Sequence, residues 1–576
     1  MSCKSLSLAL SAILAACAVS PFVSAPAAAQ KTPERQTPTG TTVNVLTRQN
    51  DNQHTGQNLQ ETILTTANVN SGSFGKLFSY PVNGQIYAQP LYVQNVSIPS
   101  KGTHNVVYVA TENDSVYAFD ADSETKNPNP LWSTSFLNPP SVVGVPCAVG
   151  AGICQLFPIV GITGTPVINL ANNTLYVVAR TMETTAGVVT YAIRLHALNI
   201  TTGAEQSGSP TLICSNSGNN GCTFPGQTVV FAPQHQQERP ALLLVSQSGF
   251  SQGVLYMGFA GNSGWVLAYD ASTLQLVGSF YTDSGNHGTT PGLPGEGHSG
   301  VWGAGGAITA DTSGNIFAIS GDGYFDGVTN WGDSLVKLVL TLNSQTGTYS
   351  LLPTDYFTPS DQACRYSTGL DLGSSSPLIL PTQAGSATPD LVVVTGKSSS
   401  VCDSVLNFYI VNRDNMGHMG GQVSLSNALQ GGSENSPAYW AGAGTQYFYN
   451  SGIGDYVRAF TVSTAGVSVA SVMNSTNTLT NGSTPAISSN GASNGILWAL
   501  DRPESPDLLP GTAPVILHAF NAAKLSSELY NSTQAGSGRD SAGPSVKFQV
   551  PTVVNGKVYV GTQTELDVYG LCPCPQ

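Results

Sequence analysis

The clearest pattern in the chain is a pair of short apolar runs joined by a polar turn, in residues 105–122 (NVVYVATENDSVYAFDAD). Valine, tyrosine and phenylalanine dominate both runs, and these residues favour extended backbone. Asn113-Asp114 marks the bend between them. The pattern predicts a β-hairpin, and an isolated hairpin is at best marginally stable in water. It must therefore pack against other parts of the chain.

The same pattern recurs along the chain in eight copies. Each copy has a small or polar residue, usually proline, followed by an apolar strand, a Gly/Asn turn, a second apolar strand, and a third that ends in Asp, Asn or Thr. The anchor residues of the copies are Pro90, Pro166, Pro240, Gly306, Pro377, Pro437, Pro485 and Pro551.

Repeats of this kind predict an all-β fold, an eight-bladed β-propeller of four-stranded antiparallel blades. One small sheet cannot bury both faces, so each blade packs between neighbours and the array closes into a ring. The eighth copy stops after three strands at Gly570. We therefore expect Phe74–Val82 to be the fourth strand of the last blade; the alternative is an outer strand of the first. The best helix candidate is the short amphipathic stretch Ala522–Tyr530.

The chain divides into four predicted parts. Residues 1–29 resemble a signal peptide, with an apolar run at Leu6–Val19 and small residues at the end. Cleavage before Cys17, which ends a lipobox-like Leu-Ala-Ala-Cys, would instead give a lipid-anchored protein. Residues 30–42 form a flexible linker. Residues 43–570 form the propeller, and 571–576 a Cys-containing tail. These features predict a secreted, periplasmic or cell-surface protein without a transmembrane segment.

Composition and charge narrow the function classes. Only 9% of residues are charged and 41% are apolar, which fits short strands and turns better than helices. The net charge of −13, without a Lys/Arg-rich run, argues against nucleic acid as a partner.

Eight cysteines follow the signal peptide, an even number that indicates disulfides in an exported protein. Zinc is a weaker interpretation, because no histidines lie at ligand spacing beside them. Spacing does not prove connectivity. The pairs it suggests are Cys147/Cys154, Cys214/Cys222, Cys364/Cys402 and Cys572/Cys574.

With the repeats in view, the chain resembles the PQQ-repeat, quinoprotein-alcohol-dehydrogenase-like β-propellers over roughly residues 43–570. The resemblance rests on phrases such as VYVATENDSVYAFDAD and VKFQVPTVVNGKVYVGTQTELDVYG. It implies the propeller fold, and a family that includes both dehydrogenases and cofactor-free scaffolds. The dehydrogenases carry an adjacent Cys-Cys disulfide against the quinone, and no two cysteines are adjacent here. The c-type haem motif CxxCH is also missing.

In a propeller, the loops that lead into the innermost strands line one mouth of the central channel. Carboxylates, an amide and cations converging there could hold Ca²⁺ or an anionic cofactor, or could only bind water and neighbouring loops. His298 is the one histidine placed to act as a general base, although a structural role fits it better. The other candidates at the mouth are Glu238, Arg239, Trp302, Arg365, Asp371, Glu434, Asn435 and Lys547.

Another distinctive loop spans residues 320–334 (SGDGYFDGVTNWGDS). Its acidic residues Asp322, Asp326 and Asp333 could ligate calcium, although their spacing is not that of an EF-hand. Trp331 and Tyr324 are suited to stacking on a sugar ring.

Two functions follow from these observations. The first is a non-catalytic scaffold that binds a protein or glycan. The alternative is a quinoprotein-type oxidoreductase that acts on an alcohol or sugar with PQQ and calcium.

Overall fold

The computed structural model describes residues 43–123, 129–148, 156–217, 221–261, 264–284, 299–398, 407–426, 428–468, 470–504 and 511–574. The chain divides into two compact units, and the second, Thr42–Gln576, contains all the described residues. The predicted signal peptide, the linker, Cys17 and His298 lie outside the described residues. None of the described helices is long and apolar enough to cross a membrane.

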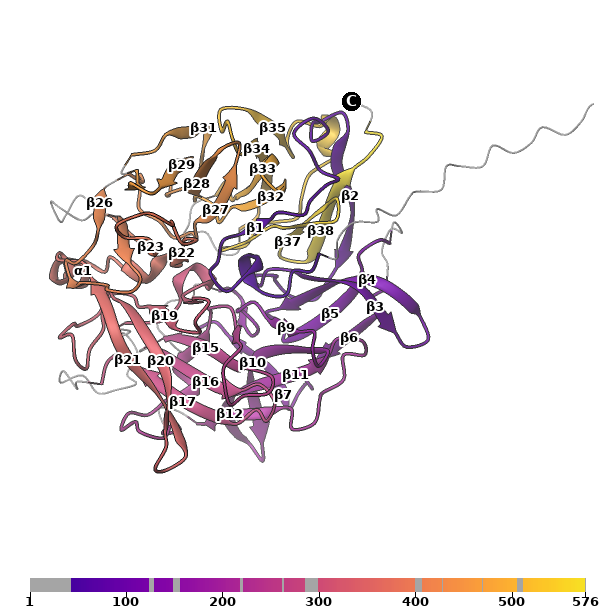
Figure 1. The fold of residues 1–576 in the computed structure, drawn as a ribbon. Coiled ribbons are helices and arrows are strands. Elements are labelled where there is room, and N and C mark those ends of the chain that lie inside the picture. Colours follow the sequence, from indigo (N-terminus) through magenta and orange to yellow (C-terminus); the bar gives the residue numbers. More distant parts are fainter. Residues whose placement is uncertain are drawn as a thin grey trace, which may run out of the picture. The chain divides into compact units, whose positions relative to one another are not determined.

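Eight small sheets follow one another around a ring, which confirms the predicted eight-bladed β-propeller (Figure 1). From the channel outwards, blade 1 consists of β3 (Leu91–Ile98), β4 (Gly102–Thr111), β5 (Ser115–Asp120) and β6 (Trp132–Ser135), and blade 2 of β9 (Val167–Asn169), β10 (Thr174–Thr185), β11 (Val188–Asn199) and β12 (Thr211–Asn216). Blade 3 consists of β14 (Leu243–Val245), β15 (Val254–Gly261), β16 (Trp265–Asp270) and β17 (Leu276–Tyr281). Blade 4 consists of β18 (Ile308–Ala310), β19 (Ile316–Ile319), β20 (Leu335–Asn343) and β21 (Thr348–Thr358).

Blade 5 consists of β22 (Leu378–Ile379), β23 (Leu391–Thr395), β24 (Phe408–Asn412) and β26 (Ser424–Ser426), and blade 6 of β27 (Ala438–Gly442), β28 (Thr445–Asn450), β29 (Asp455–Ser463) and β31 (Met473–Leu479). Blade 7 consists of β32 (Ala486–Asn490), β33 (Ser493–Asp501), β34 (Ile516–Asn521) and β35 (Glu528–Asn531). Blade 8 consists of β36 (Thr552–Val554), β37 (Lys557–Gly561), β38 (Glu565–Leu571) and β2 (Phe74–Pro81).

Short extra elements decorate this plan. Two of the added strands pair in parallel, β1 with β32 and β25 with β21. The added elements are β1 (Gln57–Asn58), β7 (Val142–Pro146), β8 (Ile159–Val160), β13 (Gln236–Glu238), β25 (His418–Met419), β30 (Gly466–Val467), α1 (Gln362–Thr368), η1 (Arg48–Asn50), η2 (Pro233–His235), η3 (Gly303–Gly305), η4 (Leu372–Ser374) and η5 (Gly536–Gly538).

The second strand of blade 1 shows why the repeated apolar runs form strands. Residues 106–111 of β4 are all buried, because neighbouring blades cover both faces of the sheet. The predicted turn follows directly, and Thr111 pairs with Ser115 across Asn113-Asp114. The predicted hairpin is therefore the β4–β5 pair, the middle of its blade.

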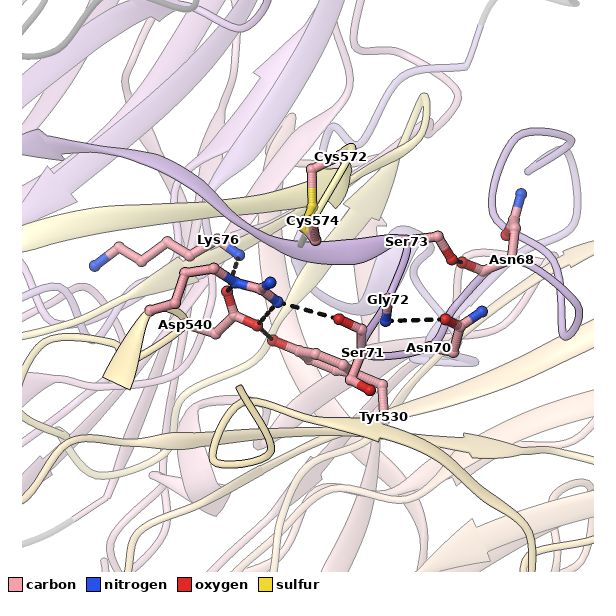
Figure 2. The surroundings of a disulfide bond; sticks show 11 residues. Asn68, Asn70, Ser71, Gly72, Ser73, Lys76, Tyr530, Asp540, Cys572 and Cys574 are labelled. Atoms are coloured by element: carbon pink, nitrogen blue, oxygen red, sulfur yellow. Dashed lines mark hydrogen bonds and ion pairs between the residues drawn. A yellow bond between two sulfur atoms is a disulfide. The ribbon is translucent and has the colours of Figure 1, made fainter. Parts of the chain in front are cut away.

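The ring closes as the sequence predicts, through β2 in the last blade. This strand pairs antiparallel with β38 and begins with Phe74 opposite Leu571. Figure 2 shows the end of this pairing, where the backbone N–H of Lys76 donates to Asp540 (3.1 Å). The two ends of the propeller sequence are thus joined in one sheet.

Residues 45–61 lie inside the ring; they are called the channel segment below and are the darkest indigo ribbon in Figure 1. The segment forms hydrogen bonds with the innermost strand of every blade, in order from blade 1 to blade 8. Its backbone and its Asn52 and Asn58 side chains make these bonds, over distances of 2.7–3.2 Å. The partners are Tyr92, Ile168, Leu244, Ala310, Ile379, Tyr439, Ile487 and Val553.

Two of the suggested disulfides are confirmed, Cys214–Cys222 and Cys572–Cys574. Cys147 and Cys364 are also disulfide-bonded, and the partners suggested for them, Cys154 and Cys402, lie outside the described residues.

The prediction of a helix at Ala522–Tyr530 is wrong. The first part is a turn, and Glu528–Asn531 forms β35, in which Tyr530 pairs with Ala519 of β34. Nine residues are too few for a helix to be stable without docking. The buried Leu525 and Tyr530 instead pack into the outer part of blade 7.

Candidate functional site

Two kinds of loop supply charged side chains to one mouth of the channel. One kind precedes the innermost strand of a blade, as at Arg239 and Glu434. The other follows the second strand, which runs back antiparallel and therefore ends at the same face. Lys397, after β23, and Arg502, after β33, belong to this second kind.

The guanidinium of Arg239 contacts two aromatic rings. Its Cζ is 4.8 Å from the centroid of the Trp302 ring and 4.7 Å from that of Phe548. Lys397 Nζ lies 5.7 Å from the Trp302 ring. Such cation–π contacts contribute about 0.5–2 kcal/mol each. The Trp302 ring is therefore already in contact with two of the chain's own cations.

Phe548 reaches this position through an unusual backbone conformation. Its φ is 60°, in the left-handed region that bulky side chains avoid. The geometry turns the ring toward Trp302, with ring centroids 6.2 Å apart. A strained residue held in contact with a functional cluster is common at ligand sites.

A lysine and two carboxyl groups form a second cluster beside Trp302. Lys397 Nζ is 2.5 Å from Asp371 and 4.0 Å from Glu434. Asp371 accepts a hydrogen bond from the backbone N–H of Asp322 (3.0 Å). Burial acts to raise the pKa of Asp371, but Lys397 and Asp322 outweigh it and lower this pKa. Burial and the charge of Asp371 raise the pKa of Asp322 to about 8, so the pair holds one proton at neutral pH.

Two further carboxyl groups lie deeper, where little solvent reaches them. Glu112 accepts hydrogen bonds from the Gly161 N–H (2.6 Å) and the Thr163 hydroxyl (2.8 Å), yet burial raises its pKa to about 7. Burial also raises the pKa of Glu238 well above its usual range, and its Oε1 has no hydrogen-bond partner. In the described part of the chain, no three His, Cys, Asp or Glu side chains gather in a way that could hold a metal ion.

One small cavity lies at the mouth among the described residues. A cavity of about 40 Å³ lies between blades 6, 7 and 8, and its lining includes Glu434, Asn435, Arg502, Lys547 and Phe548. This volume holds two or three water molecules, whereas small-molecule sites typically measure about 300–1,000 Å³.

The structure brings several of the predicted mouth residues together, whereas Glu238 lies deeper. Those that meet at the mouth are Arg239, Trp302, Asp371, Glu434, Asn435 and Lys547. Arg365 is an exception, since it is fully buried and donates to the carbonyl oxygens of Leu370 (3.3 Å) and Lys397 (3.2 Å). Its side chain holds the Lys397 loop in place through the bond to the Lys397 carbonyl and does not face a ligand.

The carboxylates of the 320–334 loop have different partners. Asp322 joins Asp371 at the mouth. Asp326 accepts hydrogen bonds from backbone N–H groups of its own loop, and Asp333 is buried and accepts from the Leu372 N–H (2.8 Å). Calcium binding by this loop stays a prediction.

Of the two aromatic residues that the sequence suggested for sugar stacking, only one is accessible. Trp331 is buried against Phe280 and Tyr356, so its predicted role is wrong. Tyr324 is 40% exposed.

Sequence reasoning missed several residues of the mouth. It considered the loops before the innermost strands and overlooked the loops after the second strands, which supply Glu112, Lys397 and Arg502. The signal was present, because each of these residues directly follows the second apolar run of its repeat.

No family model and no curated protein matches the chain. Among solved structures, the quinohemoprotein alcohol dehydrogenase from Comamonas testosteroni matches with a TM-score of 0.52 at 14% identity, over 92% of this chain and 81% of that chain. A europium-containing methanol dehydrogenase also matches with a TM-score of 0.52, at 13% identity, over 92% and 98%. The chain shares the fold of these dehydrogenases. The resemblance seen in the sequence is thus confirmed for the fold.

The residues at the mouth do not fit the tricyclic quinone that this fold suggests. The guanidinium of Arg239 contacts both the Trp302 ring and the Phe548 ring, which also lie against each other. The cavity of about 40 Å³ is several times smaller than a drug-sized ligand needs. The chain also has no adjacent cysteine pair to lie against a quinone.

Proposed function

We propose that the protein is an exported binding scaffold that holds a glycan on the rim of its channel mouth. The observation that carries this proposal is the filled interior: the channel segment bonds to all eight blades, and Arg239 packs against Trp302 and Phe548. Because the channel is filled, a ligand at the mouth binds to its surface and does not enter the channel. The disulfide-bonded cysteines support export.

A glycan fits the rim because aromatic rings and carboxyl groups lie next to each other there. Tyr324 and Tyr366 are 40% and 37% exposed. The helix that carries Tyr366, α1, is tied to the Tyr324 loop by the bond from Gln362 Nε2 to the Gly323 carbonyl (2.6 Å). Amphipathic aromatic residues of this kind supply contact area at a low entropy cost, and the adjacent Asp322–Asp371 pair can bond hydroxyl groups.

The test is a screen of the purified protein against an oligosaccharide array, followed by titration calorimetry on the best ligand. Tyr324→Ala and Tyr366→Ala should each weaken binding about tenfold, the equivalent of about 1.4 kcal/mol. The control is Val188→Ser, which changes an exposed residue on the β10–β11 hairpin of blade 2. Binding that neither tyrosine variant changes would place the glycan elsewhere.

The shared fold keeps a redox enzyme as the second candidate. The purified protein is incubated with PQQ and Ca²⁺ and assayed with alcohols and sugars in a dye-linked dehydrogenase assay. We expect no spectral change and no turnover. A stoichiometric, redox-active quinone in the protein would overturn the scaffold proposal.

A further inference from the structure

Below the mouth, a second cavity lies between the channel segment and the blades. Its volume is about 10 Å³, enough for one particle about the size of a water molecule. Two arginines line it, Arg48 from the channel segment and Arg239 from the loop before the innermost strand of blade 3, together with Tyr87, Thr163 and Thr165. The chemistry of this lining is cationic.

Arg48 is 1% exposed and has few partners for a buried guanidinium. Its Nη2 donates to the carbonyl of Ala304 (2.8 Å) and to the hydroxyl of Ser436 (3.2 Å), while its Nε is buried without a hydrogen-bond partner. No described carboxylate forms an ion pair with it. Burial lowers the pKa of Arg48 to about 9, so the side chain stays protonated at neutral pH. A buried charge without a counter-charge is costly.

Arg239 has the same deficit. Its guanidinium contacts two aromatic rings but donates no hydrogen bond among the described residues, and its Nη2 is buried without a partner. Glu434, Glu112 and Asp371 act on its pKa, yet each lies beyond ion-pair distance of it.

A hydroxyl group completes the donor set. Thr165 Oγ1 accepts a hydrogen bond from the Gln89 N–H (2.9 Å), so its own proton is available to a particle in the cavity. Thr163 already donates its proton to Glu112.

We propose that this cavity binds a single-atom anion, naturally chloride, between the guanidinium groups of Arg48 and Arg239 and the hydroxyl of Thr165. One negative charge there compensates two guanidinium groups, each of which has a buried nitrogen without a hydrogen-bond partner. The volume excludes sulfate, phosphate and carboxylate ligands. The ion links the channel segment to blades 2 and 3, and it is independent of any glycan bound on the rim.

The direct test is crystallography with bromide in place of chloride, with diffraction data collected at the bromine absorption edge. We expect an anomalous peak in the cavity, within hydrogen-bond distance of both guanidinium groups. A water molecule without anomalous signal would overturn the proposal.

Thermal unfolding gives a second readout in solution. At matched ionic strength, the Tm should be higher in sodium chloride than in sodium gluconate. Arg239→Met should abolish this difference and Thr165→Val should reduce it. The control Arg194→Met, which removes a partly exposed ion pair with Glu183 on blade 2, should keep it. An equal Tm of the unmodified protein in the two salts would contradict chloride binding.

Discussion

Phe548 has a φ of 60°, a conformation that is unfavourable for a residue with a bulky side chain, although the ring makes favourable contacts. Phe548→Ala loses the contacts with Arg239 and Trp302 but keeps the strained backbone. Phe548→Gly loses the same contacts and relieves a strain of about 1 kcal/mol. We therefore expect the glycine variant to be about 1 kcal/mol more stable than the alanine variant in urea unfolding.

The matched control is Val550, two residues along, which is not among the residues with positive φ. There the order should reverse, with Gly about 0.5–1 kcal/mol less stable than Ala. An alanine variant of Phe548 as stable as the glycine variant would show that the left-handed conformation is not held in solution.

Asp322 gives a pH-dependent prediction. Burial, reinforced by Asp371, raises its pKa to about 8 in the folded protein. The unfolded chain releases this proton near pH 4. Between these values the folded state binds more protons, so this group makes the protein less stable as pH rises, with a slope of up to about 1.4 kcal/mol per pH unit. Asp322→Asn should remove this slope.

The measurement is the free energy of unfolding by urea at several pH values between about 5 and 8. Asp326→Asn is the control. Burial opposes the shift there, but hydrogen bonds from Thr329 and other groups of its loop hold the Asp326 pKa below its usual range. Its contribution is therefore lost only as pH falls below about 4, outside the window. An unchanged slope in Asp322→Asn would mean that Asp322 is ionised throughout.

Some of these residues could be predicted and others could not, for a physical reason. Arg239 and Glu434 were found because a recurring anchor proline places them at the start of an innermost strand. Phe548 and Arg48 were missed, because a left-handed backbone and a side chain enclosed by several blades leave no local pattern. The environment of such residues exists only after the ring has closed.

Among the elements, the closing strand β2 is attached by a buried charge pair. Lys76 Nζ lies 2.6 Å from Asp567 and 3.2 Å from Glu565, both on β38. Asp567 is fully buried, and burial raises its pKa to about 7 although Lys76 lowers it. Lys76→Met would therefore leave this carboxyl group either charged without a partner or forced to take up a proton. We expect a loss of about 3 kcal/mol in urea unfolding at neutral pH.

The double variant Lys76→Met/Asp567→Asn should regain most of this loss, because it removes the unpaired charge. Lys101→Met is the control, since Lys101 is an exposed lysine in the β3–β4 turn that donates to the Leu131 carbonyl. A double variant as unstable as the single one would contradict the charge-pair argument.

The channel segment should behave as part of the core, although its sequence is polar. Most of its bonds to the blades are accepted by its carbonyl oxygens, whereas the amides of Val45 and Glu61 donate to innermost strands. Because the blades enclose the segment, its amides can exchange only when several blades separate. We expect peptides that cover residues 45–61 to exchange as slowly as those of β4 and β15 in hydrogen–deuterium exchange. Exchange as fast as in the exposed turn at Gly444 would show that the segment leaves the channel.

The sequence predicted elements well where the pattern is periodic. The β4–β5 hairpin and the closing strand β2 both follow from apolar runs at strand spacing. The channel segment carries no such pattern, because its hydrogen bonds go to eight different strands and impose no period on its side chains. The helix at Ala522–Tyr530 failed for the opposite reason, since a short apolar pattern fits a turn and a strand equally well.

For the whole molecule, closure by the N-terminal residues predicts how truncated chains behave. β2 buries Phe74, Phe78 and Tyr80 in the ring. At about 1.5–3 kcal/mol each, these three side chains supply as much as the entire net stability of many proteins, about 5–15 kcal/mol. A chain that starts at residue 83 should therefore fail to form a stable monomer, because the outer edge of β38 is open and apolar.

Two longer chains separate the contribution of β2 from that of the channel segment. The measurements are Tm and size-exclusion elution. A chain that starts at residue 43 keeps every described contact and should match the full chain. One that starts at residue 62 keeps β2 but loses the channel segment, with its hydrogen bonds to eight innermost strands. We expect it to stay monomeric with a lower Tm, since a ring that closes without its centre leaves those strands to bond water. A monomer with unchanged Tm from residue 83 would show that the ring closes through contacts other than β2.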